Sequence, residues 1–176
     1  MKKSEIIRNE ISTLEAEYKA RVKAEVFDRT DRTAENHDDL WSAFWRTYGE
    51  ETHYKIEGLK SDLIKEQNRE IEVGDGVTLH LWSDAHACTV IAKTKTTITV
   101  QRDKATLDPN FKPEWIEGGF AGHCTNQDEQ TYTYEQDPNG ETYKCRWSEK
   151  NGRFQTGSDG SMRISRGRRE FYDYNF

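Results

Sequence analysis

Long apolar segments are absent from this sequence of 176 residues. A helix that spans a membrane needs about 20 consecutive, mainly apolar residues, and no segment of the chain approaches that length. Lys2 and Lys3 resemble the start of a secretory signal, but a polar, charged segment follows them in place of an apolar stretch. Cysteine is scarce too: three residues, an odd number, fit free thiols in a reducing compartment better than a disulfide framework. We therefore expect a cytoplasmic protein with no membrane contact.

An overall positive charge is also missing. The net charge is −6, so the protein has no general positive field that would attract nucleic acid. The charge is uneven along the chain, because residues 1–72 hold 13 Lys and Arg against 17 Asp and Glu. A short basic tail stands at the other end, with Arg163, Arg166, Arg168 and Arg169. The acidic first part and the basic segment near the end can therefore bind different surfaces, or bind each other.

Paired metal ligands and catalytic signatures are lacking as well. The residues that invite a zinc hypothesis are His86, Cys88, His123, Cys124 and Cys145. They include no CxxC pair, and the adjacent His123 and Cys124 diverge on an extended backbone. The chain holds no nucleophile elbow, no phosphate-binding loop and no dinucleotide pattern. We expect no metal, no cofactor and no catalytic residue, with the role of His123 and Cys124 left open, and so a binding protein rather than an enzyme.

Aromatic residues are plentiful in an otherwise polar chain. Apolar residues make up 33% of the sequence and charged residues another 33%, with a mean hydropathy of −1.05. Seven Phe, eight Tyr and five Trp each bury far more surface than an alanine. Disordered chains are usually poor in aromatics, so we expect a folded protein with a small, aromatic-rich core.

The first part of the chain has a helical period. Residues 4–27 carry an apolar stripe at spacings of three and four, with Ser4 as the expected N-cap; the stripe consists of Ile7, Ile11, Leu14, Tyr18, Val22 and Val26. This stripe is long enough to pack on another helix or to pair two copies of the chain as a short coiled coil. A homodimer through the first helix is therefore one expectation.

Two further helices are expected before residue 72. The second begins at Thr33 and ends near Gly49, and the third, about 50–71, carries an apolar face of its own, with Ile56, Leu59 and Leu63. The second helix concentrates Trp41, Phe44 and Trp45, which are either core residues or an exposed anchor for a partner. Because its bulky residues fill two adjacent columns of the helix, we expect Trp41 to face outward.

At Val73 the hydrophobic period changes from 3.6 to 2. Short alternating segments with tight turns follow, which predicts strands at 77–82, 87–92, 97–102, 131–136, 142–147, 153–156, 162–165 and 170–174. Residues 107–129 have no regular period and form a long loop. The sequence thus predicts an α+β protein: a helical arm of two to three helices (1–72), then a small antiparallel barrel of the SH3 or Tudor kind with added hairpins (73–176).

Basic residues of the barrel suggest a nucleic-acid surface. A band is expected from Lys93, Lys95, Arg102, Lys104, Arg163, Arg166, Arg168 and Arg169, with Trp82, Trp115 or Trp147 for stacking on bases. The alternative is a solvated strand face on which Asp and Glu balance these charges.

Several segments of the second part of the chain are idiosyncratic, within about 100 of the 176 residues: 73–76, 82–84, 100–106, 118–127, 143–147 and 170–176. In these segments the chain resembles a group of small proteins encoded by phages and mobile elements of gut Firmicutes. The group has no established activity, so the resemblance implies no catalytic residue. What it implies is a phage accessory protein in the host cytoplasm, a class that often inhibits host defence, CRISPR nucleases included.

Three functions follow from these observations. The first is an inhibitor that blocks a host defence component, such as a CRISPR nuclease, by protein contact, with anchors at Trp41, Phe44, Trp45, Trp115 and Phe120. The second is a nucleic-acid-binding barrel. The third is a sponge for a small nucleotide signal, with the 107–129 loop as the lid of its pocket.

Overall fold

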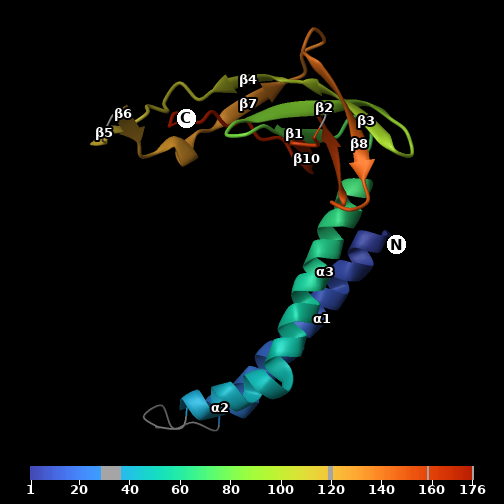
Figure 1. Cartoon of the computed structure of the whole chain (residues 1–176), viewed down its shortest axis with the longest axis vertical. Coiled ribbons are helices and arrows are strands. Elements are labelled where there is room, and N and C mark those ends of the chain that lie inside the picture. The colour runs from blue at the N-terminus through green and yellow to red at the C-terminus, as the bar shows by residue number, and fades with distance from the viewer. Residues whose placement is uncertain (29–36, 119–120, 158, 176) are drawn as a thin grey trace. The chain divides into compact units, whose positions relative to one another are not determined.

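A computed structural model describes residues 1–28, 37–118, 121–157 and 159–175. The chain divides into two compact units, residues 1–67 and 68–176. The first unit is helical and the second is built mainly of strands (Figure 1). The α+β class, with the helices preceding a closed antiparallel barrel, is confirmed.

The helical unit consists of α-helices joined by π-helical turns. Helix α1 spans Lys3–Val22 and continues into the turn η1, Lys23–Phe27. Helix α2 (His37–Phe44), the turn η2 (Trp45–Gly49) and helix α3 (Glu50–Arg69) follow one another without a break. The predicted helix over 4–27 is confirmed, but the predicted end at Gly49 is wrong. The predicted start at Thr33 lies outside the described residues.

Gly49 makes room for aromatic rings and does not end a helix. It is buried, and a Cβ atom at this position would lie 2.9 Å from Cε3 of Trp45 and 3.2 Å from Cε1 of Phe44. Only a residue without a side chain lets both rings approach the backbone this closely. The sequence pattern placed a glycine where a helix could end, but the helical segment continues through Gly49, because the aromatic rings pack against its backbone.

The N-cap of α1 also differs from expectation. The capping position is Lys2, whose backbone N–H donates to the Glu5 carboxylate at 3.0 Å. Ser4 lies inside the helix and is buried, so the prediction of Ser4 as the cap is wrong. A carboxylate in the first turn satisfies an otherwise free N–H and also favours the positive end of the helix dipole.

The apolar stripe of α1 packs against α3 of the same chain, and the two helices lie side by side in Figure 1. The contact consists of the buried Ile7, Ile11 and Ile56 and the partly buried Leu14, Leu59 and Leu63. Ion pairs from Lys3 to Glu66 at 2.8 Å and from Lys60 to Glu15 at 3.2 Å show an antiparallel arrangement. The stripe is thus covered within one chain, while pairing of two chains through α1 stays a prediction.

The second unit contains a closed barrel of six antiparallel strands, in the order β1-β10-β9-β8-β3-β2. The strands are β1 Gly76–His80, β2 Ala85–Lys93, β3 Thr97–Arg102, β8 Thr142–Ser148, β9 Arg153–Thr156 and β10 Met162–Arg166. Its core holds Val77, Leu79, Ile98 and Val100, which are fully buried as the alternating pattern predicts. Ile71 belongs to the same core, so the residues just before Val73 pack on the barrel.

Residues between β3 and β8 form an insertion of two small sheets. Strand β4 (Lys104–Leu107) pairs with β7 (Tyr132–Glu135), and β5 (Trp115–Gly118) pairs with β6 (Ala121–Cys124), followed by the short helix η3 (Gln127–Glu129). Figure 1 shows the β5–β6 hairpin at the end of the insertion away from the barrel. Residues 107–129 are therefore more regular than expected. Strand β5 is exposed along its whole length, so it has no apolar alternation that the sequence could reveal.

The C-terminal residues 170–174 are not a strand, contrary to expectation. The barrel closes through the pairing of β10 with β1, and the tail contributes one isolated bridge between Phe171 and Ala85. Further along, the tail attaches to the insertion: Asn175 Nδ2 donates to the Cys124 carbonyl at 3.0 Å, and the Tyr174 N–H donates to Gln127 at 3.0 Å. The tail therefore ties the insertion to the barrel through individual polar contacts.

Candidate functional site

Aromatic side chains concentrate at the α2–η2 segment of the helical unit. Phe44 is 3% exposed, and its ring lies 5.6 Å from that of Tyr18 and 5.7 Å from that of Tyr48. Trp41 is 36% exposed, which confirms that it faces outward, and Trp45 is half-buried with its ring 5.6 Å from His53. Phe44 is thus a core residue, and the two tryptophans lie at the surface above it.

Trp41 and Trp45 line a surface depression of about 510 Å³ together with Ser42 and Arg46. We call these four residues the Trp41/Trp45 face. Tryptophan and arginine are the residues most enriched among the energetic hot spots of protein interfaces. The ring of the buried Phe44 contacts the Trp41 ring at a centroid distance of 6.0 Å. Pre-ordering a side chain in this way lowers the entropy cost of binding.

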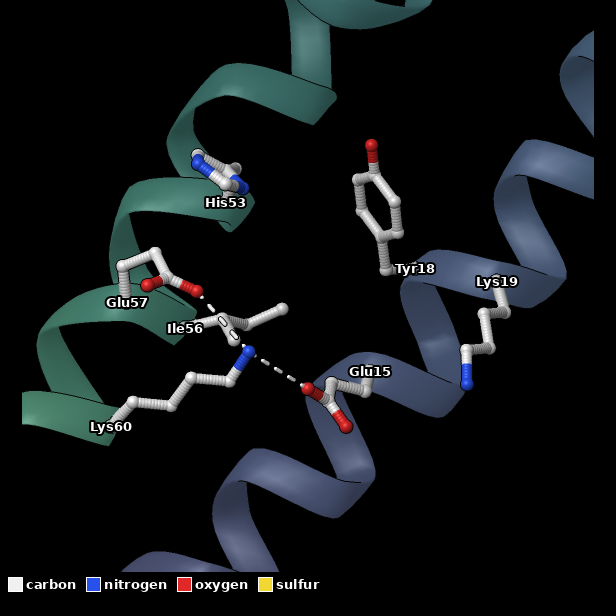
Figure 2. A pocket seen from close by; sticks show the side chains of 7 residues that line it. All are labelled: Glu15, Tyr18, Lys19, His53, Ile56, Glu57 and Lys60. Carbon is white, nitrogen blue, oxygen red and sulfur yellow. Dashed lines mark hydrogen bonds and ion pairs between the residues drawn. The ribbon is translucent and has the colours of Figure 1, made fainter. Parts of the chain in front are cut away.

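A second pocket, of about 230 Å³, lies between α1 and α3 (Figure 2). Its centre is Lys60, whose Nζ atom lies 3.1 Å from Glu57 and 3.2 Å from Glu15. The hydrogen bonds that Lys60 donates to these two carboxylates raise its pKa. Lys60 and the two carboxylates therefore satisfy one another, and among the described residues that line the pocket Lys19 is the cation without a carboxylate partner.

The other predicted anchors lie in the insertion of the second unit. Trp115 is 52% exposed and makes an edge contact with the ring of Tyr174, at 6.0 Å. Phe120 lies outside the described residues. Trp115 therefore belongs to a different compact unit from Trp41, Phe44 and Trp45, and the predicted anchors do not form one cluster within either unit.

Most of the predicted basic band is engaged in ion pairs. Five of its eight residues have a carboxylate partner: Lys93 with Glu72 (2.8 Å), Arg102 with Glu170 (3.0 Å), Lys104 with Glu135 (3.9 Å), Arg166 with Asp75 (3.8 Å) and Arg168 with Asp103 (2.7 Å). In the described parts of the chain, Lys95, Arg163 and Arg169 have no such partner. The band as predicted is thus largely neutralised by the fold.

The ion pair between Arg102 and Glu170 belongs to a larger set of contacts at Glu170. Its carboxylate accepts hydrogen bonds from His86 Nδ1 at 3.2 Å, from the Ala87 N–H at 2.8 Å and from Arg102 at 3.0 Å. Burial acts to raise the pKa of Glu170, but these hydrogen bonds and the charges of His86 and Arg102 outweigh it, so the pKa is lowered. The contacts attach the tail to β2 and β3 and have a structural role.

A different group of side chains, with two arginines, becomes visible once the strand register is known. Arg146 on β8 pairs with Gln155 on β9, Gln155 pairs with Arg163 on β10, and Arg163 pairs with His80 on β1. We call these four residues the basic row. They lie on the outer face of the barrel, because the alternate residues of the same strands, Cys145, Phe154, Ile164 and Leu79, are buried in its core.

No Asp or Glu lies on any of the six barrel strands, although the chain holds 32 acidic residues. The carboxylates that pair with the predicted band come from turns, the insertion and the tail. Among the described residues, Arg146 and Arg163 of the basic row have no carboxylate partner, so positive charge stays unbalanced on this face of the barrel. The lack of Asp and Glu in these segments is visible in the sequence, but it can be recognised only after the strand boundaries are assigned.

The cysteines and histidines do not converge on a reactive centre. Burial raises the pKa of the core thiols Cys88 and Cys145 to about 12 and about 11, which makes both poor nucleophiles. Cys124 is buried while His123 is exposed on the same strand, so their side chains take opposite faces, as predicted. Within residues 1–28, 37–118, 121–157 and 159–175, no group of three His, Cys, Asp or Glu could hold a metal ion.

A pocket of about 330 Å³ lies at the base of the insertion, where β4 meets β7. Its walls are Thr106, Leu107, Asp108, Pro109, Thr131, Tyr132 and Thr133. Asp108 is the one charged side chain among them, and it is an anion. A nucleotide placed here would have no cationic partner for its phosphate, which weakens the case for a nucleotide sponge at this position.

Comparison with known proteins yields no match to a family model, to a curated protein or to a solved structure. No helix within the described ranges is long and apolar enough to cross a membrane. The functional argument therefore rests on the surfaces described above.

Proposed function

We propose that the protein binds another protein through the Trp41/Trp45 face and inhibits that partner by contact. The observation that carries the proposal is a tryptophan at 36% exposure beside a second, half-buried tryptophan and an arginine, around a depression of about 510 Å³. Such a depression accepts a partner's side chain, while the tryptophans supply apolar contact area at a low cost in conformational entropy.

The proposed partner is a host defence component, and a CRISPR nuclease is the specific candidate. This part is supported by the resemblance of residues 73–176 to phage-encoded proteins and by the acidic balance of residues 1–72. A nuclease holds its nucleic acid in a positively charged channel, and an acidic helical arm complements such a channel in charge.

The test combines capture and inhibition. The tagged full chain is incubated with host lysate, the retained protein is identified, and purified partner is assayed with and without the full chain. Trp41→Ala should weaken binding by at least roughly 2 kcal/mol, about thirtyfold in Kd, and abolish inhibition at stoichiometric concentration. Ile64→Ala is the matched control, because Ile64 is an exposed apolar residue (59%) of the same helical unit outside the face. Equal inhibition by both variants contradicts the assignment of this face.

We propose in addition that the barrel is of the SH3 or Tudor kind. What supports this is the meander of β1, β2 and β3 with short polar turns, continued by β8, β9 and β10 into a closed barrel. An experimental structure that superposes on no SH3-like barrel would remove this part of the proposal and leave the binding face unaffected.

A further inference from the structure

We propose that the outer face of β8, β9, β10 and β1 binds single-stranded nucleic acid. The two arginines of the basic row, Arg146 and Arg163, contact phosphates on either side of Gln155, and Trp82, in the turn that follows β1, stacks on a base. This surface lies in the second unit and does not depend on the Trp41/Trp45 face, which lies in the first.

The first step is geometric. Four neighbouring strands place Arg146, Gln155, Arg163 and His80 in one row across the sheet. Neighbouring strands are about 4.8 Å apart, so the row extends over roughly 14 Å, the length of a few nucleotides. Lys144 and Arg153 lie on the same outer face, each two residues from a member of the row on its own strand.

The second step concerns charge. Within the described residues, neither Arg146 nor Arg163 has a carboxylate within ion-pair distance, in contrast to Arg102 and Arg168. Burial and the charges of Arg163, Arg169 and Arg153 lower the pKa of His80, as expected where positive charges gather without a counter-charge. A bound phosphate would supply that counter-charge.

The third step is the aromatic residue. Trp82 is 92% exposed, so it contributes almost nothing to the core. It stands two residues after His80, in a turn held by the bond from the Leu81 N–H to the Asp84 carbonyl at 2.9 Å. Exposed aromatics beside a cationic surface form stacking platforms for unpaired bases.

Single-stranded nucleic acid fits this combination better than other anions. A repeating row of donors matches a repeating series of phosphates, whereas a phosphopeptide offers one phosphate group to one or two of the cations. Stacking of a base on an exposed indole requires unpaired bases, because the bases of a duplex are already stacked on each other.

The experiment measures binding of the full chain to a fluorescein-labelled oligo-dT of about 15 nucleotides by anisotropy, over a series of salt concentrations. The wild type should bind with a steep loss of affinity as salt rises. Arg146→Gln combined with Arg163→Gln should weaken binding about tenfold or more. It should also lower the slope of log K against log salt by about 1.4, since each lost phosphate contact on a single strand accounts for about 0.7. Trp82→Ala should weaken binding about tenfold with an unchanged slope.

The matched control is Arg8→Gln combined with Lys23→Gln, which removes the same number of charges from exposed positions of the helical unit. It should bind as the wild type does. Thermal melting should be the same for all variants, because every substituted side chain except Trp82 projects from an outer face and Trp82 is almost fully exposed. Absence of binding, equal weakening by the control, or tighter binding of a duplex of the same length would each overturn the proposal.

Discussion

Arg168 Nε lies 2.7 Å from Oδ2 of Asp103, a carboxylate whose side chain is 1% exposed. The other oxygen of Asp103 accepts a hydrogen bond from the Thr89 hydroxyl at 2.7 Å, and Arg168 donates a second bond, to that hydroxyl, at 2.8 Å. Arg168 therefore completes a three-residue network that joins the segment after β10 to Thr89 on β2 and to Asp103, the residue after β3. The charge of Arg168 stabilises the fold.

Removal of this arginine should destabilise the protein. Arg168→Gln leaves the Asp103 carboxylate buried without its cation, and uncompensated buried charges are costly. Since Arg168 itself is partly exposed, at 32% of its side chain, we expect a loss of about 2 kcal/mol in the free energy of unfolding. Urea denaturation measures it. Lys95→Gln, at an exposed position of the β2–β3 turn, should stay within about 0.5 kcal/mol of the wild type.

The lowered pKa of Glu170 predicts an acid-sensitive fold. A carboxyl whose folded pKa is below its ordinary value of 4.5 stabilises the protein above that value, and the stabilisation is lost as the pH falls through the folded pKa. The free energy of unfolding should therefore drop below about pH 4.5. Glu170→Gln should be less stable than the wild type at pH 7, and the difference between them should shrink as the pH falls. A constant difference across that range would show that Glu170 does not titrate with folding.

The hydrophobic period correctly predicted those helices and strands that have one buried and one exposed face. The stripe of α1 and the alternation in β1 and β3 were readable because one face of each is buried against a core. Strand β5 was missed since both of its faces are exposed. The segment from Glu170 to Tyr174 resembled a strand in composition, yet it is held by side-chain and backbone contacts specific to single residues.

The sequence predicted those features of the candidate surfaces that depend on residues close together in the chain. The outward position of Trp41 followed from helix geometry, because residues three and four apart share a face. The basic row depends on a register that joins Arg163 to His80, residues far apart in sequence, and no local pattern carries this information. The predicted band failed to anticipate that carboxylates of turns and of the tail pair with its members.

Phe44 and Trp41 should respond differently to truncation. The Phe44 side chain is 3% exposed, so Phe44→Ala leaves a buried cavity where its ring was. We expect a loss of about 3–5 kcal/mol in the free energy of unfolding. Trp41→Ala should cost less, about 1 kcal/mol, because part of its ring already contacts solvent. Urea denaturation followed by circular dichroism measures both. Equal losses would place Trp41 in the core and remove it as a binding residue.

The two glycines of the 37–69 helical segment should respond in opposite directions to alanine. Alanine favours a helix by about 1 kcal/mol over glycine. Gly58 has nothing within 4 Å of an added Cβ, so Gly58→Ala should stabilise the protein by up to about 1 kcal/mol. At Gly49 the new Cβ would lie 2.9 Å from the Trp45 ring and 3.2 Å from the Phe44 ring. One of these rings must therefore move, and overpacking of this kind costs about 1–3 kcal/mol. Gly49→Ala should accordingly lower the melting temperature while Gly58→Ala raises it. If both raise it, the rings beside Gly49 can shift freely, and the support that Phe44 gives to the Trp41/Trp45 face is weaker than the packing indicates.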